Sequence, residues 1–198
     1  KPYNKYYALD LYCKENNLFL FIDGARLGYG LASTKSDLTM SELSNLCDAF
    51  YIGGTKVGAL FGEAVVFKSA EMHRSFRYAI KQHGGMLAKG RLLGIQFEQL
   101  LKGGNDCLYF RLARHANEQA SRIRKAFEAK GIPMWIDSPT NMQFPLLTKE
   151  QQVALGEKFV PEFWGKYDGE RDIVRFCTSW ATKPENVDAL CDYIERML

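Results

Sequence analysis

The sequence predicts an α/β protein: a mainly parallel sheet in the first part of the chain, followed by a small α+β domain. Two short apolar runs, Leu18–Ile22 and Ala49–Ile52, end in glycine-containing segments and are separated by helix-like sequence. Such runs are typical of buried strands in a parallel sheet. After residue 104 a long helical stretch precedes several short apolar runs, which indicates a sheet with helices on one face.

Helical periodicity surrounds the two predicted strands. Asn16 and Asn17 end the first helix before its strand. Thr39 and Glu42 have the spacing of a capping box. The segment 58–67 predicts two strands that turn near Gly62. The expected helices in this part of the chain are 4–15, 36–47, 69–81 and 87–101.

The break at Gly103-Gly104-Asn105 separates a predicted domain over residues 1–103 from a second over residues 104–198. Residues 106–130 have the pattern of one long amphipathic helix. Gly131 and then Pro133 follow it, in the order expected of a helix stop. Further strands are expected at 134–136, 142–146, 159–164 and 173–177, and further helices at 149–157 and 185–197.

Each of the first two predicted strands is followed by a reactive side chain. Asp23 follows the first strand, and Lys56 follows the second in Gly53-Gly54-Thr55-Lys56. Parallel sheets open their ligand crevice at the carboxyl ends of the strands, so we expect both residues on one rim. Pyridoxal phosphate requires a lysine for its Schiff base and an aspartate at its pyridine nitrogen. Neighbouring glycines would let backbone approach the flat ring, and apolar surroundings would make the Lys56 amine nucleophilic.

Both residues also have ordinary structural explanations. Asp23 could cap a following helix, and Lys56 could be a solvated turn residue. Taken singly, each of these explanations is the commoner one, and the cofactor hypothesis depends on the two residues ending separate buried strands. A dinucleotide site is a poor interpretation of the segment 27–33, because Ser33 stands where the last glycine of that motif is required.

Three segments resemble the low-specificity threonine aldolases, which belong to the beta-eliminating lyase group of fold-type I pyridoxal-phosphate enzymes. They are Asp23-Gly24-Ala25-Arg26-Leu27, Gly53–Lys56 and Val174–Trp180. The resemblance covers nearly all of the chain. Many members of the family have Ser-Lys-Gly where this chain has Thr55-Lys56-Val57, which puts substrate preference in doubt more than cofactor use. The resemblance implies that residues 1–103 are the carboxyl-terminal part of the large cofactor-binding domain, and residues 104–198 the small domain.

The resemblance also implies roles for individual residues. Lys56 and Asp23 are the expected catalytic residues and also bind the cofactor. Ala25 is expected under the pyridine ring, and Arg26 beside the ring hydroxyl, although Arg26 could also be a surface residue at a helix start. Lys89 is expected at the phosphate, with nearby basic residues as alternatives. No metal ligand is expected.

Arg175 is the expected substrate-binding residue. It lies inside the apolar strand Ile173–Cys177, where a buried guanidinium needs a carboxylate partner. The carboxylate of an amino-acid substrate would be such a partner, since the guanidinium fork binds it through two hydrogen bonds. A structural ion pair within the protein is the alternative.

The activity implied by the resemblance is cleavage of the Cα–Cβ bond of a β-hydroxy amino acid with pyridoxal 5'-phosphate as cofactor. Threonine would give glycine and acetaldehyde. One alternative is a β-eliminating lyase of the same group. The other is an inactive fragment that lacks the phosphate-binding segment.

Composition excludes several other classes of protein. A net charge of +3 is too small to indicate nucleic-acid or acidic-membrane partners. No apolar run approaches the roughly 20 residues that span a bilayer, and there is no signal-peptide pattern. The 5 cysteines are widely spread without a CxxC pair, which favours reduced thiols in the cytoplasm over zinc or disulfides. We therefore expect a cytoplasmic enzyme. The resemblance also implies that it forms a homo-oligomer, either a dimer or a tetramer.

The chain begins at Lys1, inside a helical pattern. In the family that it resembles, an earlier segment carries the phosphate loop and a side chain that stacks on the cofactor ring. We therefore expect these residues to be the carboxyl-terminal part of a longer enzyme. Taken alone, they are expected to bind the cofactor weakly and to cover their apolar surface by self-association or against the rest of the enzyme.

Overall fold

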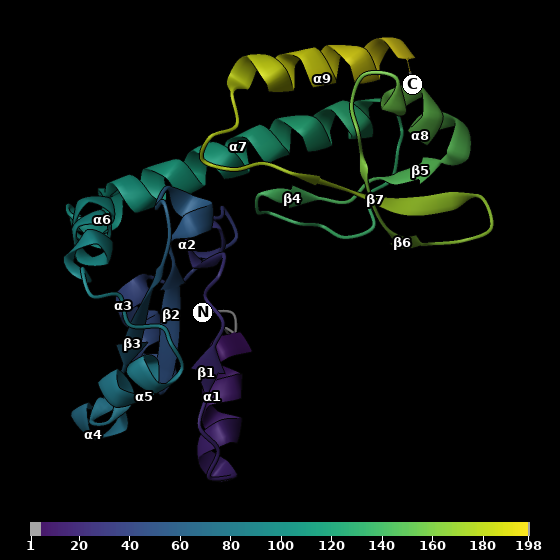
Figure 1. Cartoon of the computed structure of the whole chain (residues 1–198). Helices are drawn as coiled ribbons and strands as arrows, with labels where there is room; N and C mark the ends of the chain where they lie inside the picture. Colours follow the sequence, from purple (N-terminus) through teal and green to yellow (C-terminus); the bar gives the residue numbers. More distant parts are fainter. Residues whose placement is uncertain (1–4, 198) are drawn as a thin grey trace. The chain divides into compact units, whose positions relative to one another are not determined.

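The computed structural model describes residues 5–197, which form two compact units (Figure 1). Unit 1 consists of the described residues up to Leu31 together with Ser36–Phe110. Unit 2 consists of Ala32–Lys35 and the described residues from Arg111 onward. Helix α7 (Leu108–Ala129) begins in unit 1 and continues into unit 2. The domain division after residue 103 stays a prediction.

Unit 1 contains a sheet with the strand order β1-β2-β3. Strand β1 (Phe21–Ile22) runs parallel to β2 (Ala49–Gly53), and β3 (Glu63–Phe67) is antiparallel to β2. The first predicted strand is thus paired over only its last two residues. Of the two strands predicted over 58–67, only the second forms, because Gly58 and Gly62 have φ values of 104° and 95° and turn the chain before it.

The helices of unit 1 differ from the predicted ones mainly at their ends. Residues 69–81 form two short helices rather than one, and the five-residue helix α2 was not predicted. The capping box is confirmed: the Glu42 amide donates to Thr39 Oγ1 at 3.1 Å, and the Thr39 amide donates to Glu42 Oε2 at 2.8 Å. Asn4, the predicted start of the first helix, lies outside the described residues. The helices are α1 (Lys5–Glu15), α2 (Leu27–Leu31), α3 (Met40–Leu46), α4 (Ala70–His73), α5 (Phe76–Gln82) and α6 (Arg91–Leu101), with 3-10 turns η1 (Thr55–Val57) and η2 (Gly104–Asp106).

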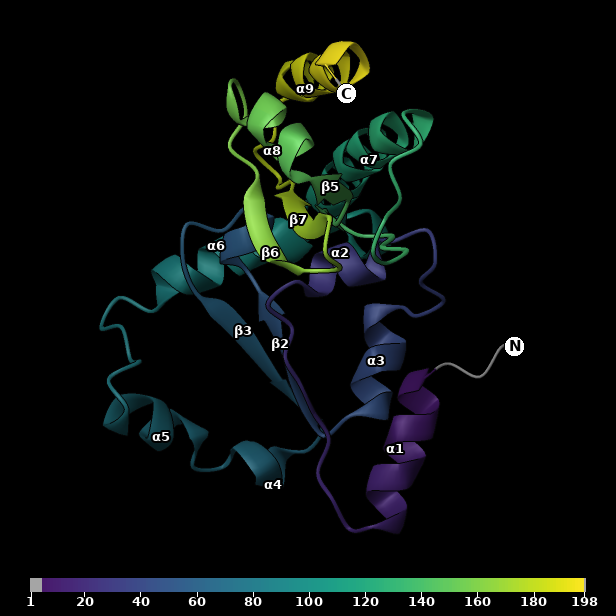
Figure 2. The same cartoon turned by 90° about the vertical axis from the view of Figure 1, so that its right-hand side faces the viewer.

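Unit 2 is built around strand β7 (Arg171–Cys177), which pairs antiparallel with three shorter strands. Helices cover one face of this sheet (Figure 2), as the sequence predicts. Side chains from the sheet and from the helices meet in one buried cluster that includes Phe127, Leu147 and Val174. The other elements of the unit are β4 (Met142–Gln143), β5 (Leu146–Thr148), β6 (Glu162–Lys166), α8 (Lys149–Gly156) and α9 (Pro184–Met197).

Two strand predictions in unit 2 are wrong, and Pro145 accounts for part of the difference. The segment 134–136 forms only one isolated bridge, between Met134 and Pro145. Proline has no amide hydrogen with which to continue a ladder. The predicted strand 142–146 is interrupted at the same place and appears as the separate strands β4 and β5.

Most of the cysteine side chains are buried. Cys13, Cys47 and Cys107 are buried, and burial raises the pKa of the Cys47 thiol to about 11. Cys177 is exposed. Within residues 5–197, none of the helices has both the length and the apolar character needed to cross a membrane.

Candidate functional site

The loops that follow β1 and β2 touch at two glycines. The Gly53 amide donates to the Gly24 carbonyl at 2.9 Å. A Cβ at Gly24 would lie 1.6 Å from the carbonyl oxygen of Tyr51, and a Cβ at Gly53 would lie 2.5 Å from that of Ala25. Only glycine fits at such distances. The chain's own backbone therefore fills the space directly beside Gly24 and Gly53, and the close approach of neighbouring glycines to a cofactor ring stays a prediction.

Because β1 and β2 are parallel neighbours, these loops leave the same edge of the sheet. Asp23 directly follows β1, and Lys56 follows β2 in the turn η1. The positive charge of Lys56 contributes to lowering the pKa of the Asp23 carboxyl. The structure thus brings the carboxylate and the amine within electrostatic reach of each other.

The main chain around Lys56 is held from several sides. The Gly54 amide donates to Glu63 Oε2 at 3.1 Å, and the buried Tyr29 phenol donates to the Lys56 carbonyl. Val57, the next residue, is completely buried. Lys56 itself is exposed, so the expectation of apolar surroundings is wrong for the part of the chain that the structure describes. The backbone is anchored while the amine stays accessible.

Tyr109 joins the same loop to helix α2. Its phenol donates to the Gly53 carbonyl at 3.1 Å and accepts a hydrogen bond from the Gly28 amide at 3.0 Å. The side chain is completely buried, and this burial raises the pKa of the phenol. One neutral hydroxyl therefore satisfies two backbone groups from separate segments of unit 1.

Asp23 is ionised and held in place. Its Oδ1 accepts hydrogen bonds from the Tyr51 phenol and, at 3.0 Å, from the Ala25 amide. The bond from Tyr51 is the main cause that lowers the pKa of Asp23, followed by the Ala25 amide and by the charges of Lys56 and Arg26. The same bond raises the pKa of Tyr51 to about 12. The bond from Ala25 is a local turn contact rather than the cap of a following helix, because the next helix, α2, begins only at Leu27.

Arg26 is half-buried at the start of α2, and its carbonyl accepts from the Gly30 amide at 3.2 Å. Its Nε is buried and has no hydrogen-bond partner among the described residues. A buried donor of a charged group is costly to leave unpaired, so this position calls for an acceptor. Ala25 is half-buried beside it. Lys89 is exposed in the turn before α6, and its carbonyl accepts from the Leu92 amide at 3.0 Å.

These groups fit the cofactor that the sequence predicts. Pyridoxal phosphate has an aldehyde for an amine, a ring nitrogen for a carboxylate, and acidic oxygens for hydrogen-bond donors. Lys56 offers the accessible amine, Asp23 the ionised carboxylate, and Arg26 an Nε donor that has no partner among residues 5–197. The described loops therefore contain partners for the aldehyde, the ring nitrogen and an acidic oxygen of such a group.

Arg175 lies in β7 of unit 2 and has a carboxylate partner in the protein. Its Nε donates to Glu162 Oε2 at 2.9 Å, and its Nη2 donates to Glu162 Oε1 at 2.6 Å. Its guanidinium carbon is 4.6 Å from the centroid of the Trp164 ring. The structural ion pair named as the alternative is thus present, while the substrate-binding role stays a prediction.

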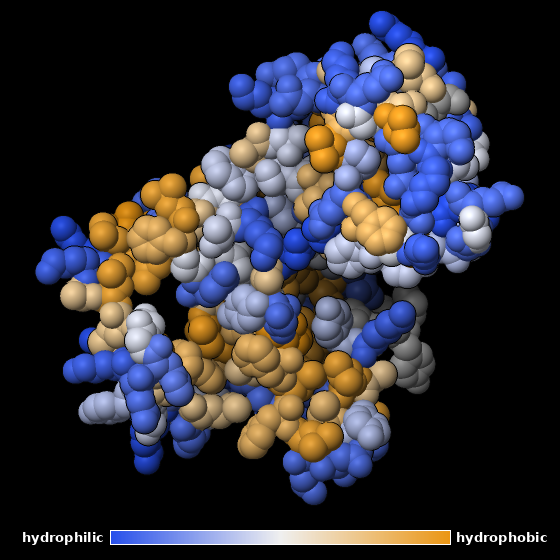
Figure 3. Space-filling view, turned by 45° about the vertical axis from the view of Figure 1, so that its right-hand side comes forward, coloured by the Kyte–Doolittle hydropathy of each residue, from blue (hydrophilic) through white to orange (hydrophobic). Residues whose placement is uncertain are grey.

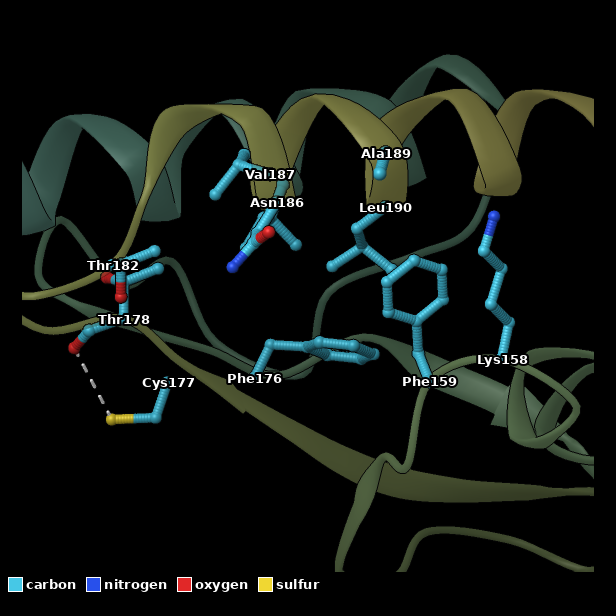
Figure 4. A pocket seen from close by; sticks show the side chains of 11 residues that line it. Lys158, Phe159, Phe176, Cys177, Thr178, Thr182, Asn186, Val187, Ala189 and Leu190 are labelled. Carbon is cyan, nitrogen blue, oxygen red and sulfur yellow. Dashed lines mark hydrogen bonds between the residues drawn. The ribbon is translucent and has the colours of Figure 1, made fainter.

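The same unit contains an apolar pocket of about 480 Å³ between β7 and α9 (Figure 4). Phe159, Phe176 and Leu190 contribute to its walls, and Lys158 lies 6.0 Å from the centroid of the Phe159 ring. Among the described residues that line it there is neither a carboxylate nor an imidazole, and Arg175 does not line it. This pocket offers no acid–base pair for catalysis.

Four residues of the site were not predicted from the sequence: Tyr29, Tyr51, Tyr109 and Glu63. Tyr109 contacts backbone groups 81 and 56 residues away, and Tyr51 contacts a residue 28 positions earlier. No local pattern encodes such pairings. Tyr51 had one usable signal, since it lies in a predicted strand beside the one that leads to Asp23.

Comparison with known proteins supplies independent evidence. No family model matches the chain. A low specificity L-threonine aldolase from Pseudomonas sp. is 30% identical to this chain, and the match covers 96% of this chain and 54% of the relative. A low specificity L-threonine aldolase from Pseudomonas aeruginosa is also 30% identical, and the match covers 92% of this chain and 51% of the relative. A solved threonine aldolase from Leishmania major has a TM-score of 0.91 and 38% identity, with 96% of this chain and 55% of that chain covered. The resemblance to the threonine aldolases is confirmed.

The chain spans about half the length of the curated threonine aldolases that it matches. More distant structures show the fold alone. A serine palmitoyltransferase from Sphingomonas wittichii has a TM-score of 0.62 at 13% identity, covering 94% of this chain and 49% of that one. The fold is that of the fold-type I pyridoxal-phosphate enzymes, as the sequence predicts.

Proposed function

We propose that these residues belong to a pyridoxal-phosphate-dependent threonine aldolase. It cleaves the Cα–Cβ bond of a β-hydroxy amino acid, and threonine gives glycine and acetaldehyde. The observation that carries this proposal is the position of Asp23 and Lys56, in touching loops at the ends of adjacent parallel strands. The threonine aldolases at 30% and 38% identity support it.

Bound pyridoxal phosphate supplies a protonated ring that withdraws electrons from the bonds at the α-carbon of an amino acid. In this proposal Lys56 supplies the amine that holds the cofactor's aldehyde. Asp23 keeps a proton on the ring nitrogen, and Tyr51 fixes the orientation of its carboxylate. Because the Asp23 carboxylate is already ionised and hydrogen-bonded, it is preorganised to bind the protonated ring nitrogen.

Three further residues complete the proposed cofactor contacts. Arg26 donates from its buried Nε to an acidic oxygen of the cofactor, which would satisfy a donor that is unpaired within the described part of the chain. Ala25 packs under the ring, where only a small side chain leaves room. Lys89, exposed before α6, contributes positive charge toward the phosphate.

Arg175 binds the substrate carboxylate in this proposal. A guanidinium presents several donors in one plane, so it fixes both the position and the orientation of a carboxylate. Holding that group sets the direction of the Cα–Cβ bond relative to the rest of the substrate. The proton of the β-hydroxyl leaves as this bond breaks, the aldehyde departs, and a proton takes its place on the α-carbon.

We also propose that the enzyme is a cytoplasmic homo-oligomer, a dimer or a tetramer, that acts on small amino acids. Large apolar side chains exposed on unit 1 support the oligomer: Phe19 and Leu60 are each 81% exposed, and Tyr78 is 77% exposed. Figure 3 shows hydrophobic surface exposed on the side of the molecule that it presents. Exposed apolar groups that lie together are typical of surfaces covered in an assembly.

Product analysis of the full-length protein tests the proposed reaction. The protein is incubated with pyridoxal phosphate and, separately, with L-threonine, L-serine and L-tryptophan. An aldolase releases glycine and acetaldehyde from threonine in equal amounts. A β-eliminating lyase instead releases ammonia and a keto acid, and this result would contradict the proposed reaction while keeping the cofactor. No product from any of the three would contradict both.

A further inference from the structure

The β6–β7 hairpin of unit 2 contains two sets of a carboxylate, an arginine and an aromatic ring. In the first set Arg175 donates to Glu162, which is its direct partner across the strands, and stacks on Trp164. In the second set Arg171 donates to Asp168 from Nε at 3.0 Å and from Nη2 at 2.7 Å, and its guanidinium carbon is 5.4 Å from the centroid of the Tyr167 ring. The two sets use the same chemistry on one hairpin.

Their surroundings differ. The Arg175 side chain is 20% exposed, whereas that of Arg171 is 36% exposed. Trp164 packs edge-on against Phe144 with ring centroids 5.6 Å apart, and Phe144 belongs to a buried cluster with Ile173. Because side chains alternate along a strand, Arg175 shares the sheet face of Ile173 rather than the face covered by the helices. The first set is therefore attached to a packed layer.

The hydrogen bonds of Arg175 leave part of its guanidinium available. Glu162 accepts from Nε and Nη2, which form one edge of the group. Nη1 has no hydrogen-bond partner among the described residues. A guanidinium has five N–H donors, so the edge formed by Nη1 and Nη2 can still bind a second carboxylate with two hydrogen bonds.

We infer that Glu162 and Trp164 are positioning residues that hold the Arg175 guanidinium with its free edge available to the substrate carboxylate. This inference rests on the proposed function. Glu162 fixes the rotation of the guanidinium in its plane, and Trp164 fixes that plane. An arginine held in advance loses less conformational freedom when the substrate binds, so both residues strengthen substrate binding without contacting the substrate.

The test uses the full-length enzyme with its cofactor and the variants Glu162→Gln, Glu162→Ala and Trp164→Leu. Asp168→Asn, in the second set, is the matched control. Three quantities are measured: kcat and KM for L-threonine, and the Kd for glycine by calorimetry, which needs no turnover. We expect Glu162→Gln and Trp164→Leu to raise KM and Kd about 3-fold, and Glu162→Ala to raise them about 10-fold. We expect kcat to stay within about 2-fold, the pattern of lost uniform binding.

We expect Asp168→Asn to leave KM and Kd unchanged. Unchanged or lower values in the Glu162 variants would overturn the inference, since lower values mean that Glu162 competes with the substrate. An equal effect of Asp168→Asn would also overturn it, because the effect would then be general to the hairpin. Urea unfolding identifies any variant that fails to fold, and the isosteric Glu162→Gln keeps the test decisive. If the unaltered enzyme neither cleaves threonine nor binds glycine, the proposed function itself fails, and the inference fails with it.

Discussion

The Gly53 amide donates to the Gly24 carbonyl across 2.9 Å, and this bond joins the loop that carries Asp23 to the loop that leads to Lys56. Two residues that are far apart in the sequence are thereby placed at one edge of the sheet. The contact depends on the absence of side chains at both glycines.

Gly24→Ala should destabilise the protein. The added Cβ would lie 1.6 Å from the Tyr51 carbonyl oxygen, and backbone must move to admit it. Overpacking of this kind costs about 1–3 kcal/mol or more. The measurement is the free energy of unfolding in urea. Gly30→Ala is the control, since a Cβ at Gly30 meets nothing within 4 Å. Equal stability of the two variants would show that the contact is not tight.

Tyr109→Phe should also destabilise the protein, because it leaves the Gly53 carbonyl and the Gly28 amide without their shared partner. A buried polar group left unpaired costs about 1–3 kcal/mol. Thermal unfolding measures the loss. Tyr78→Phe, at a side chain that is 77% exposed, should change the midpoint very little. If Tyr109→Phe behaves like Tyr78→Phe, the two bonds do not contribute as described.

Tyr51→Phe should raise the pKa of Asp23, because the phenol is the main cause that lowers it. With a folded-state pKa below the usual value, Asp23 adds stability above that usual value and loses it as the pH falls. In the Tyr51→Phe variant, the stability that Asp23 contributes should therefore depend less on pH. Carbon-13 NMR titration of the cofactor-free protein measures the change. Asp137 is an internal reference, since Lys35 and Arg124 lower its pKa to about 2. An unchanged pKa of Asp23 in Tyr51→Phe would contradict this account.

Asp23→Ala should leave cofactor attachment intact and slow the reaction. Without the carboxylate, the ring nitrogen loses the charge that keeps it protonated. A loss of this kind costs several kcal/mol of barrier, on the order of 10²-fold or more in kcat. Steady-state kinetics with L-threonine measures the effect. A near-normal kcat would remove Asp23 from its proposed role.

Local patterns in the sequence predicted much of the frame of the molecule. The capping box of Thr39 and Glu42 and the helix stop at Gly131 each depend on residues within a few positions of one another. The common edge for Asp23 and Lys56 followed from a rule about parallel strands. These features need no knowledge of distant contacts.

Contacts between distant residues explain what the sequence did not predict. The phenol of Tyr109 binds Gly28 and Gly53, and nothing near Tyr109 in the sequence indicates either partner. The ion pair of Arg175 with Glu162 depends on the register of two strands, which the sequence did not define. The segment 134–136 had the composition of a strand, yet its neighbour Pro145 lacks the amide that a ladder requires.

The most direct test of the central claim is the mass of the full-length protein after borohydride reduction in the presence of pyridoxal phosphate. The unaltered protein should gain the mass of one reduced cofactor per chain, and peptide mapping should place it on Lys56. Lys56→Ala should gain none, while Lys102→Ala, at an exposed lysine of the same unit, should gain as much as the unaltered protein. A Lys56→Ala protein that still acquires the cofactor stoichiometrically on another lysine would contradict the account.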